Sequence, residues 1–88
     1  MFEITDNKLN LLVDGNIVGY ILYDEKDDYI IGSYIYVTPE MRGRGYALKL
    51  IDRFVEFSKD KNKKILPVCP VIKRVIENQY KDVLRWLL

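Results

Sequence analysis

The stretch TPEMRGRGYALKL, residues 38–50, places two glycines and two arginines between an apolar run and an amphipathic run. The apolar run, Tyr29–Val37, is rich in β-branched and aromatic residues and predicts a strand. The amphipathic run repeats apolar side chains at helical spacing and predicts a helix. The quoted stretch is therefore the corner at which a strand passes into a helix.

The predicted helix has one apolar face and one charged face. The apolar face is formed by Ala47, Leu50, Ile51, Phe54, Phe57 and Ser58, and the opposite face by Lys49, Asp52, Arg53, Glu56 and Lys59. The polar run 60–63 ends this helix, and the apolar run Ile65–Val68 predicts another strand. Because a helix carries the chain back, this strand is expected to run parallel to Tyr29–Val37, in a right-handed β-α-β unit.

Two further apolar runs, Lys8–Val13 and Ile17–Tyr23, precede this unit. They are joined by Asp14-Gly15-Asn16, which favours a tight hairpin turn. A second helix is predicted at Val71–Asn78. The sequence thus predicts an α+β fold, in which an antiparallel β meander is followed by a β-α-β unit and a C-terminal helix.

The strand Tyr29–Val37 alternates apolar and aromatic side chains. Ile35 and Val37 lie on one face, and Tyr34 and Tyr36 lie on the other. Both faces therefore have side chains to bury, which predicts a central strand.

Composition limits the domain organisation and the partners. A chain of 88 residues with 49% hydrophobic side chains is expected to form a single domain, residues 1–88, with one core. The net charge of +1 gives no general attraction to nucleic acid or to an anionic membrane, so neither partner is expected. No apolar run is long enough to span a bilayer and the start MFEITDNK lacks signal-peptide features, which predicts a cytoplasmic protein. The apolar end around Trp86 is expected to cover the core or to form a dimer patch, giving a monomer or a weak dimer.

Cys69 is the only cysteine, and the chain contains no histidine. This excludes an internal disulfide and every serine–histidine or cysteine–histidine dyad, and no metal site is expected. From the residues alone, Cys69 is interpreted as a small buried hydrophobe rather than a nucleophile.

The strand-to-helix corner has the composition of an anion site. A helix N-terminus offers unpaired N–H groups and the positive end of the helix dipole. Gly43 and Gly45 allow positive φ and close approach, and Arg42 and Arg44 add charge-assisted hydrogen bonds. The alternative is a tight turn with solvated arginines, in a domain that serves only protein interaction.

The run 37–47 resembles the acyl-CoA diphosphate loop of the Gcn5-related N-acetyltransferase superfamily, R/Q-x-x-G-x-G/A. Its fixed positions fall on Arg42, Gly45 and Ala47. The segment Ile65–Val71, with its P-x-C run, and the segment Tyr80–Leu84 are similar to the short subfamily of bacterial YjdJ-type and plant minimal acetyltransferases. The three segments occur in the order found in that subfamily, and the resemblance covers nearly the whole chain.

The resemblance implies an N-acetyltransferase that binds acetyl-CoA and transfers the acetyl group by direct attack of an amine. The pantetheine would lie between the strands 29–37 and 65–68, with the diphosphate on the loop 41–47. The implied CoA-binding residues are Val37, Met41, Arg42, Gly43, Arg44, Gly45, Tyr46, Ala47, Cys69 and Lys73. The acceptor is left open between a protein lysine or N-terminus and a small amine. A CoA-binding module with weak or no transferase activity is the alternative.

Relatives often place a histidine or threonine on the strand that faces the cleft, where this chain has Ser33, Tyr34 and Tyr36. Tyr34 is the predicted acid that protonates the leaving thiolate, with Tyr36 as an alternative and Glu40 as another candidate base. The resemblance places Cys69 at the thiol end of CoA, with covalent transfer through it as an alternative to direct attack. Full-size relatives build the acceptor site partly from helices that are replaced here by a tight turn, which predicts a shallow, open acceptor groove.

Overall fold

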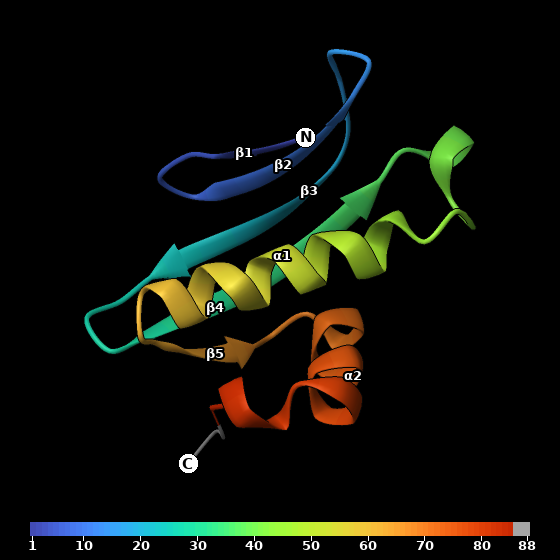
Figure 1. Ribbon diagram of the computed structural model, residues 1–88. Helices are drawn as coiled ribbons and strands as arrows, with labels where there is room; N and C mark the ends of the chain where they lie inside the picture. Colours follow the sequence, from blue (N-terminus) through green and yellow to red (C-terminus); the bar gives the residue numbers. More distant parts are fainter. Residues whose placement is uncertain (86–88) are drawn as a thin grey trace.

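The computed structural model describes residues 1–85, which form one five-stranded sheet with two α-helices (Figure 1). The strands lie in the order β1 (Phe2–Ile4), β2 (Lys8–Val13), β3 (Asn16–Glu25), β4 (Tyr29–Val37) and β5 (Lys64–Pro67). The helices are α1 (Tyr46–Asp60) and α2 (Pro70–Gln79), with the short 3-10 helices η1 (Pro39–Met41) and η2 (Lys81–Val83). Strands β1 to β4 are antiparallel and β5 is parallel to β4. The predicted α+β fold, with its meander and β-α-β unit, is confirmed.

The hairpin between β2 and β3 has the predicted tight turn. Val13 pairs with Asn16, so the loop consists of Asp14 and Gly15 alone, with φ of 51° and 81°. Positive φ at both loop residues matches the twist of the flanking strands.

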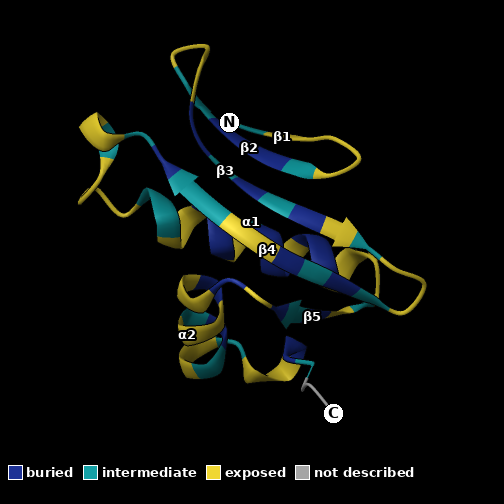
Figure 2. Ribbon diagram, turned by 180° about the vertical axis from the view of Figure 1, so that it is seen from behind, coloured by how far each residue is buried: buried dark blue, intermediate teal, exposed yellow. Residues whose placement is uncertain are grey.

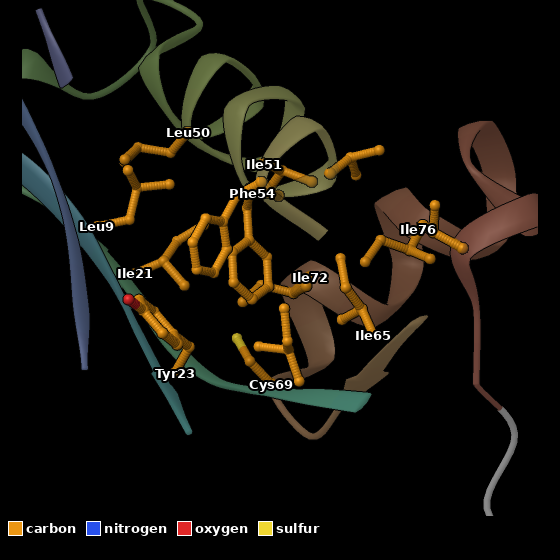
Figure 3. Close-up of a cluster of buried hydrophobic side chains, with 14 of the residues drawn as sticks. Leu9, Ile21, Tyr23, Leu50, Ile51, Phe54, Ile65, Cys69, Ile72 and Ile76 are labelled. Carbon is orange, nitrogen blue, oxygen red and sulfur yellow. The ribbon is translucent and has the colours of Figure 1, made fainter. Parts of the chain in front are cut away.

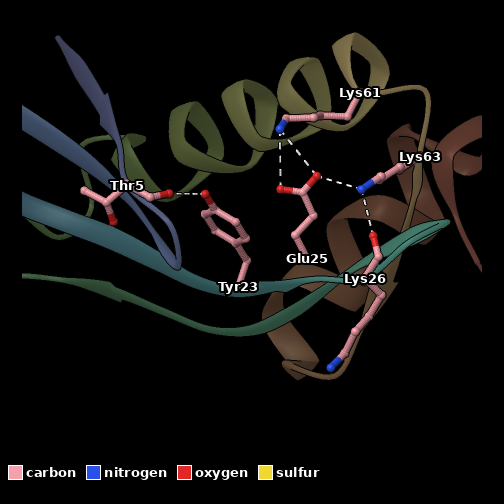
Figure 4. Close-up of polar contacts among 6 residues, drawn as sticks. All are labelled: Thr5, Tyr23, Glu25, Lys26, Lys61 and Lys63. Carbon is pink, nitrogen blue, oxygen red and sulfur yellow. Dashed lines mark hydrogen bonds and ion pairs between the residues drawn. The ribbon is translucent and has the colours of Figure 1, made fainter.

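Strand β1 was missing from the sequence prediction. It is a three-residue edge strand in which Phe2 pairs with Leu11 of β2. Such a short segment shows no clear alternation, so only its pairing with β2 identifies it. The Tyr23 hydroxyl donates a hydrogen bond to the Thr5 carbonyl and fastens the turn that follows β1 (Figure 4). Burial, and then the negative charges of Glu25 and Asp6, raise the pKa of Tyr23.

Both helices pack on the same face of the sheet. A Cβ atom on Gly32 of β4 would lie 3.1 Å from Phe54 of α1 and 3.5 Å from Ile72 of α2. The core between these layers is apolar and contains Leu9, Ile21, Tyr23, Leu50, Ile51, Phe54, Ile65, Cys69, Ile72 and Ile76 (Figure 3). Figure 2 shows the opposite face of the sheet in front of α1. Among residues 1–85, none of the helices combines the length and apolar character that a membrane crossing requires.

A β-bulge at Ser33 changes the alternation of side chains along β4. Tyr23 of β3 pairs with Gly32, whereas Leu22 pairs with Tyr34, which leaves Ser33 without a partner on β3. Ile30 and Gly32 therefore face the core before the bulge, and Ile35 and Val37 face it afterwards. β4 lies between β3 and β5, which confirms the predicted central strand, with Tyr34 on the face opposite Ile35 as predicted. Tyr34 is 47% exposed, however, so the expected burial of both faces does not hold there.

A cluster of charges holds the β3–β4 turn against the segment that precedes β5 (Figure 4). The Lys63 Nζ donates to Glu25 Oε2 and to the Lys26 carbonyl, both at 2.7 Å. The Lys61 Nζ lies 3.4 Å from Glu25 Oε2. The hydrogen bond from Lys63 is the main cause that lowers the pKa of Glu25. The predicted packing role of Trp86 falls outside the described residues.

We expect Glu25→Gln to lower stability at neutral pH but not in acid. Because the folded pKa of Glu25 is lowered, its ionised form stabilises the fold above the unfolded carboxyl pKa, about 4.3. This contribution is lost as the pH falls through the folded pKa. For a partly exposed ion pair we expect a loss of about 0.2–1 kcal/mol at pH 7. Urea unfolding of both proteins at pH 7 and at low pH measures it.

Asp27→Asn in the same turn is the matched control, because Asp27 forms no ion pair within residues 1–85. It should leave the free energy of unfolding nearly unchanged at both pH values. A Glu25→Gln effect that persists undiminished at low pH would contradict the assigned role of the ion pair.

Candidate functional site

A cleft opens where strands β4 and β5 separate. Their pairing ends at Gly32 and Pro67, although β4 continues to Val37. The last main-chain hydrogen bonds run from the Val68 and Cys69 N–H groups to the Gly32 carbonyl, at 2.9 and 3.1 Å. Pro67 has no amide hydrogen with which to extend the ladder, and Pro70 turns the chain into α2. The second half of β4 is therefore left without a strand neighbour on this side.

The free edge of β4 presents main-chain polar groups to the cleft. The Thr38 N–H donates to the Val18 carbonyl at 2.8 Å. This hydrogen bond shows which residues of β4 direct their main-chain groups towards β3. Since main-chain groups alternate between the two edges of a strand, those of Ile35 and Val37 point away from β3 and into the cleft. The Arg42 Nε donates to the Val37 carbonyl at 2.8 Å.

The loop after β4 leads into an uncapped helix N-terminus. Gly43 and Gly45 have φ of 79° and 81°, as the sequence predicted, and nothing lies within 4 Å of a Cβ atom placed on either. Glycine is required there by the backbone conformation rather than by crowding. The Lys49 N–H donates to the Gly45 carbonyl at 3.1 Å, and no side chain caps α1. Its first turn holds no acidic residue, so its N–H groups and its positive dipole are available to an anion.

The cleft and the loop together enclose a pocket of about 410 Å³. Its lining residues are Tyr34, Ile35, Tyr36, Val37, Met41, Arg42, Gly43, Gly45, Tyr46, Ala47, Leu48 and Val71. The predicted site residues Tyr34, Val37, Met41, Arg42, Gly43, Gly45, Tyr46 and Ala47 are thus brought together. Ile35, Leu48 and Val71 were missed by the sequence analysis. Leu48 and Val71 are apolar yet about half exposed at the starts of their helices, and this departure from the amphipathic pattern is the signal that identifies them.

Three predicted CoA-binding residues do not line this pocket. Arg44 is exposed on the loop. Lys73 follows Val71 by two residues on α2, which turns it about 200° away from the pocket wall. Cys69 is only 7% exposed, and its sulfur points into the apolar core near Ile72 (Figure 3). The structure thus gives Cys69 the packing role inferred from the residues alone, and a catalytic role for it stays a prediction.

The pocket combines two kinds of chemistry along its length. At one end, the N-terminus of α1 and Arg42 offer N–H donors and positive charge, which suit a phosphate. Along the other wall, apolar side chains alternate with the free main-chain groups of β4, which suit an extended chain that carries amides. The arrangement fits a long ligand with an anionic group at one end.

The family model for GCN5-related N-acetyl-transferases matches residues 2–83. The chain belongs to this acetyltransferase family. Family membership and fold support N-acetyltransferase activity in general, whereas the proposed short subfamily stays a prediction. Among curated proteins, no relative matches the chain.

Solved structures share the fold. A GCN5-like protein from Staphylococcus aureus is 27% identical with a TM-score of 0.76, and the match covers 100% of this chain and 90% of that one. A ribosomal-protein-alanine N-acetyltransferase from Brucella melitensis is 23% identical with a TM-score of 0.67, over 91% of this chain but only 63% of the other. An aminoglycoside N-acetyltransferase solved with CoA is 18% identical with a TM-score of 0.64, over 92% and 72% of the two chains.

The burial of Cys69 predicts that its thiol reacts slowly in the native protein. We expect the native protein to react with Ellman's reagent roughly tenfold or more slowly than the urea-unfolded protein, because the sulfur is reached only through local opening. Following the absorbance of the released thiolate in both states measures the ratio. Labelling of the native protein at the rate of the unfolded chain would contradict the packing role.

Proposed function

We propose that this protein transfers an acetyl group from acetyl-CoA to a primary amine by direct attack within a ternary complex. The observation that carries the proposal is the pocket, in which the uncapped N-terminus of α1 adjoins the free edge of β4. An acyl-CoA has a diphosphate and an amide-bearing pantetheine chain, so it matches both ends of this pocket. We also infer that a single domain, residues 1–88, carries the activity.

The residues present fit such a ligand. The N–H groups at the start of α1 would donate to the diphosphate, and the left-handed glycines leave open space for its oxygens. Arg42 uses its Nε on the Val37 carbonyl, and its Nη groups donate to no partner within residues 1–85, so they are free to meet a phosphate. The pantetheine amides would pair with Ile35 and Val37 in the way that an added strand pairs with a sheet edge.

In the proposed step, the neutral amine attacks the thioester carbonyl carbon, which forms the C–N bond. A main-chain N–H of the cleft that the pantetheine leaves unpaired stabilises the oxyanion that develops. The C–S bond then breaks, and the thiolate takes a proton. Tyr34 lines the pocket and is the proposed proton donor, regaining its proton from the amine through water.

The alternative is a CoA-binding module without transferase activity. The residues that line the pocket include no aspartate, glutamate or histidine, so no carboxylate or imidazole lies on its described walls to act as the general base. CoA binding without acetylation of any amine would support this alternative. Acetyl transfer to an amine, detected by mass spectrometry, would exclude it.

A pair of glycine variants tests the ligand site. Gly45 and Gly15 both have φ of 81° and open space where a Cβ atom would lie, but only Gly45 adjoins the pocket. We expect Gly45→Ala and Gly15→Ala to cost a similar roughly 1–2 kcal/mol of stability, because both force alanine into the left-handed region. Only Gly45→Ala should weaken CoA binding, by roughly tenfold or more, because N–H contacts to the diphosphate are lost.

Amide NMR titration with CoA measures this effect. In the unaltered protein, the largest shifts should fall on residues 42–47 and on Ile35 and Val37. Equal CoA affinity in the two glycine variants, or no shift at millimolar CoA, would contradict the site.

A further inference from the structure

The face of the sheet opposite the helices carries a group of tyrosines. Tyr20 of β3 and Tyr34 and Tyr36 of β4 form what we call the tyrosine face. The ring centroid of Tyr20 lies 6.4 Å from that of Tyr34 and 5.4 Å from that of Tyr36. Figure 2 shows the strands in front of α1 on this side, and no helix of residues 1–85 covers them.

The tyrosine face is continuous with the pocket. Tyr34 and Tyr36 line the pocket and also belong to the face, because the bulge at Ser33 turns them away from the core. An acceptor that rests on this face is therefore beside the cleft in which the proposed transfer takes place. Val68, at the point where β5 leaves the sheet, is 59% exposed and extends the apolar surface.

The shape of this face suits a protein rather than a small amine. Small ligands are recognised in concave sites that bury most of their surface, whereas this is an open sheet face. The exposed ring of Tyr34 and the half-buried rings of Tyr20 and Tyr36 offer the kind of large, amphipathic contact area that is enriched at protein interfaces. A protein partner is also large enough to cover the tyrosine rings and exclude water from them.

The charges on this face favour an acidic partner. Lys8 of β2 and Lys64 of β5 project from it, and the Lys8 Nζ lies 4.7 Å from the Tyr20 centroid. Within residues 1–85, neither lysine has a carboxylate within ion-pair distance. Two acids lie on the same face: Asp24 is paired with Lys26 at 3.4 Å, and Glu3, on the edge strand β1, accepts from the Asn10 Nδ2 at 3.1 Å and keeps its charge. The lysines Lys8, Lys26 and Lys64 therefore outnumber the acids.

We propose that the tyrosine face is the docking surface for a protein acceptor whose docking segment carries acidic side chains near the acetylated amine. The partner's aromatic or apolar side chains rest on Tyr20 and Tyr34, and its carboxylates meet Lys8 and Lys64. This inference rests on the proposed function, since the amine must reach the cleft at Tyr34.

Two peptide probes of equal length test the proposal. Each carries one central lysine and one phenylalanine and has a blocked N-terminus. In the acidic peptide, aspartates and glutamates flank the lysine, and in the basic peptide, arginines flank it. Arginine is used because its guanidinium group does not accept an acetyl group here, so the central lysine is the single acceptor amine in each peptide. Butylamine is the small-amine probe. Transfer from acetyl-CoA and amide NMR shifts are measured for each.

We expect the acidic peptide to be acetylated with a kcat/KM roughly tenfold or more above that of the basic peptide, with the preference falling at high salt. Its NMR shifts should fall on Tyr20, Tyr34 and Tyr36. Lys8→Glu should abolish the preference and leave butylamine transfer unchanged. Lys81→Glu is the matched control, because Lys81 is exposed on η2 and has no ion pair within residues 1–85, and it should keep the preference.

Several results would overturn the proposal. These are equal kcat/KM for the two peptides, a higher kcat/KM for butylamine than for the acidic peptide, or peptide shifts that avoid the tyrosine face. Shifts of that face with protein concentration alone, unaffected by peptide, would assign it to a second copy of the chain. The binding readout needs no CoA, so an acidic peptide that shifts the tyrosine face supports the docking surface even where the proposed transfer fails.

Discussion

The Gly32 carbonyl accepts the last main-chain hydrogen bonds between β4 and β5, and the functional surfaces depend on where this pairing ends. Pro67 and Pro70 stop the parallel strand and start α2, so β5 leaves the sheet opposite Gly32. A longer β5 would pair with the rest of β4 and close the cleft. The separation of the two strands therefore creates the wall against which an extended ligand can pair.

Much of the fold could be predicted because its signals are local. The Asp14-Gly15 loop, the helical spacing in α1 and the left-handed glycines of the corner each follow from the residues concerned. The resemblance to the acetyltransferase family then predicted that most of the pocket residues lie at one site. The bulge at Ser33 could not be predicted, because it is defined by pairing with β3, a partner distant in sequence. The alternation correctly separates Tyr34 from Ile35, but only the bulge places Tyr34 on the face opposite Gly32 and the core.

The burial of Cys69 was predicted from the residues alone, whereas the resemblance placed this residue at the thiol end of CoA. The residue lies between the end of β5 and the start of α2, where the strand alternation from Ile65 and Pro67 and the helical spacing to Ile72 both place it on the core side. The prolines on either side, Pro67 and Pro70, constrain the backbone, and the resulting turn directs the sulfur into the core. A contact between Cys69 and CoA stays a prediction.

The bulge at Ser33 decides what kind of surface lies on the face of the sheet opposite the helices. Had β4 kept a regular alternation, Tyr34 and Tyr36 would point towards the helices, where the core is already filled by Phe54 and Ile72. Turned outwards, their rings pack against Tyr20 while the hydroxyl ends can stay hydrated. Leucine or phenylalanine at these positions would form a surface that associates strongly and without selection. Tyrosines, with Lys8 over one of the rings, keep the face wettable. Such a surface suits a partner that binds and then leaves, as the proposed exchange of acetylated product for new acceptor requires.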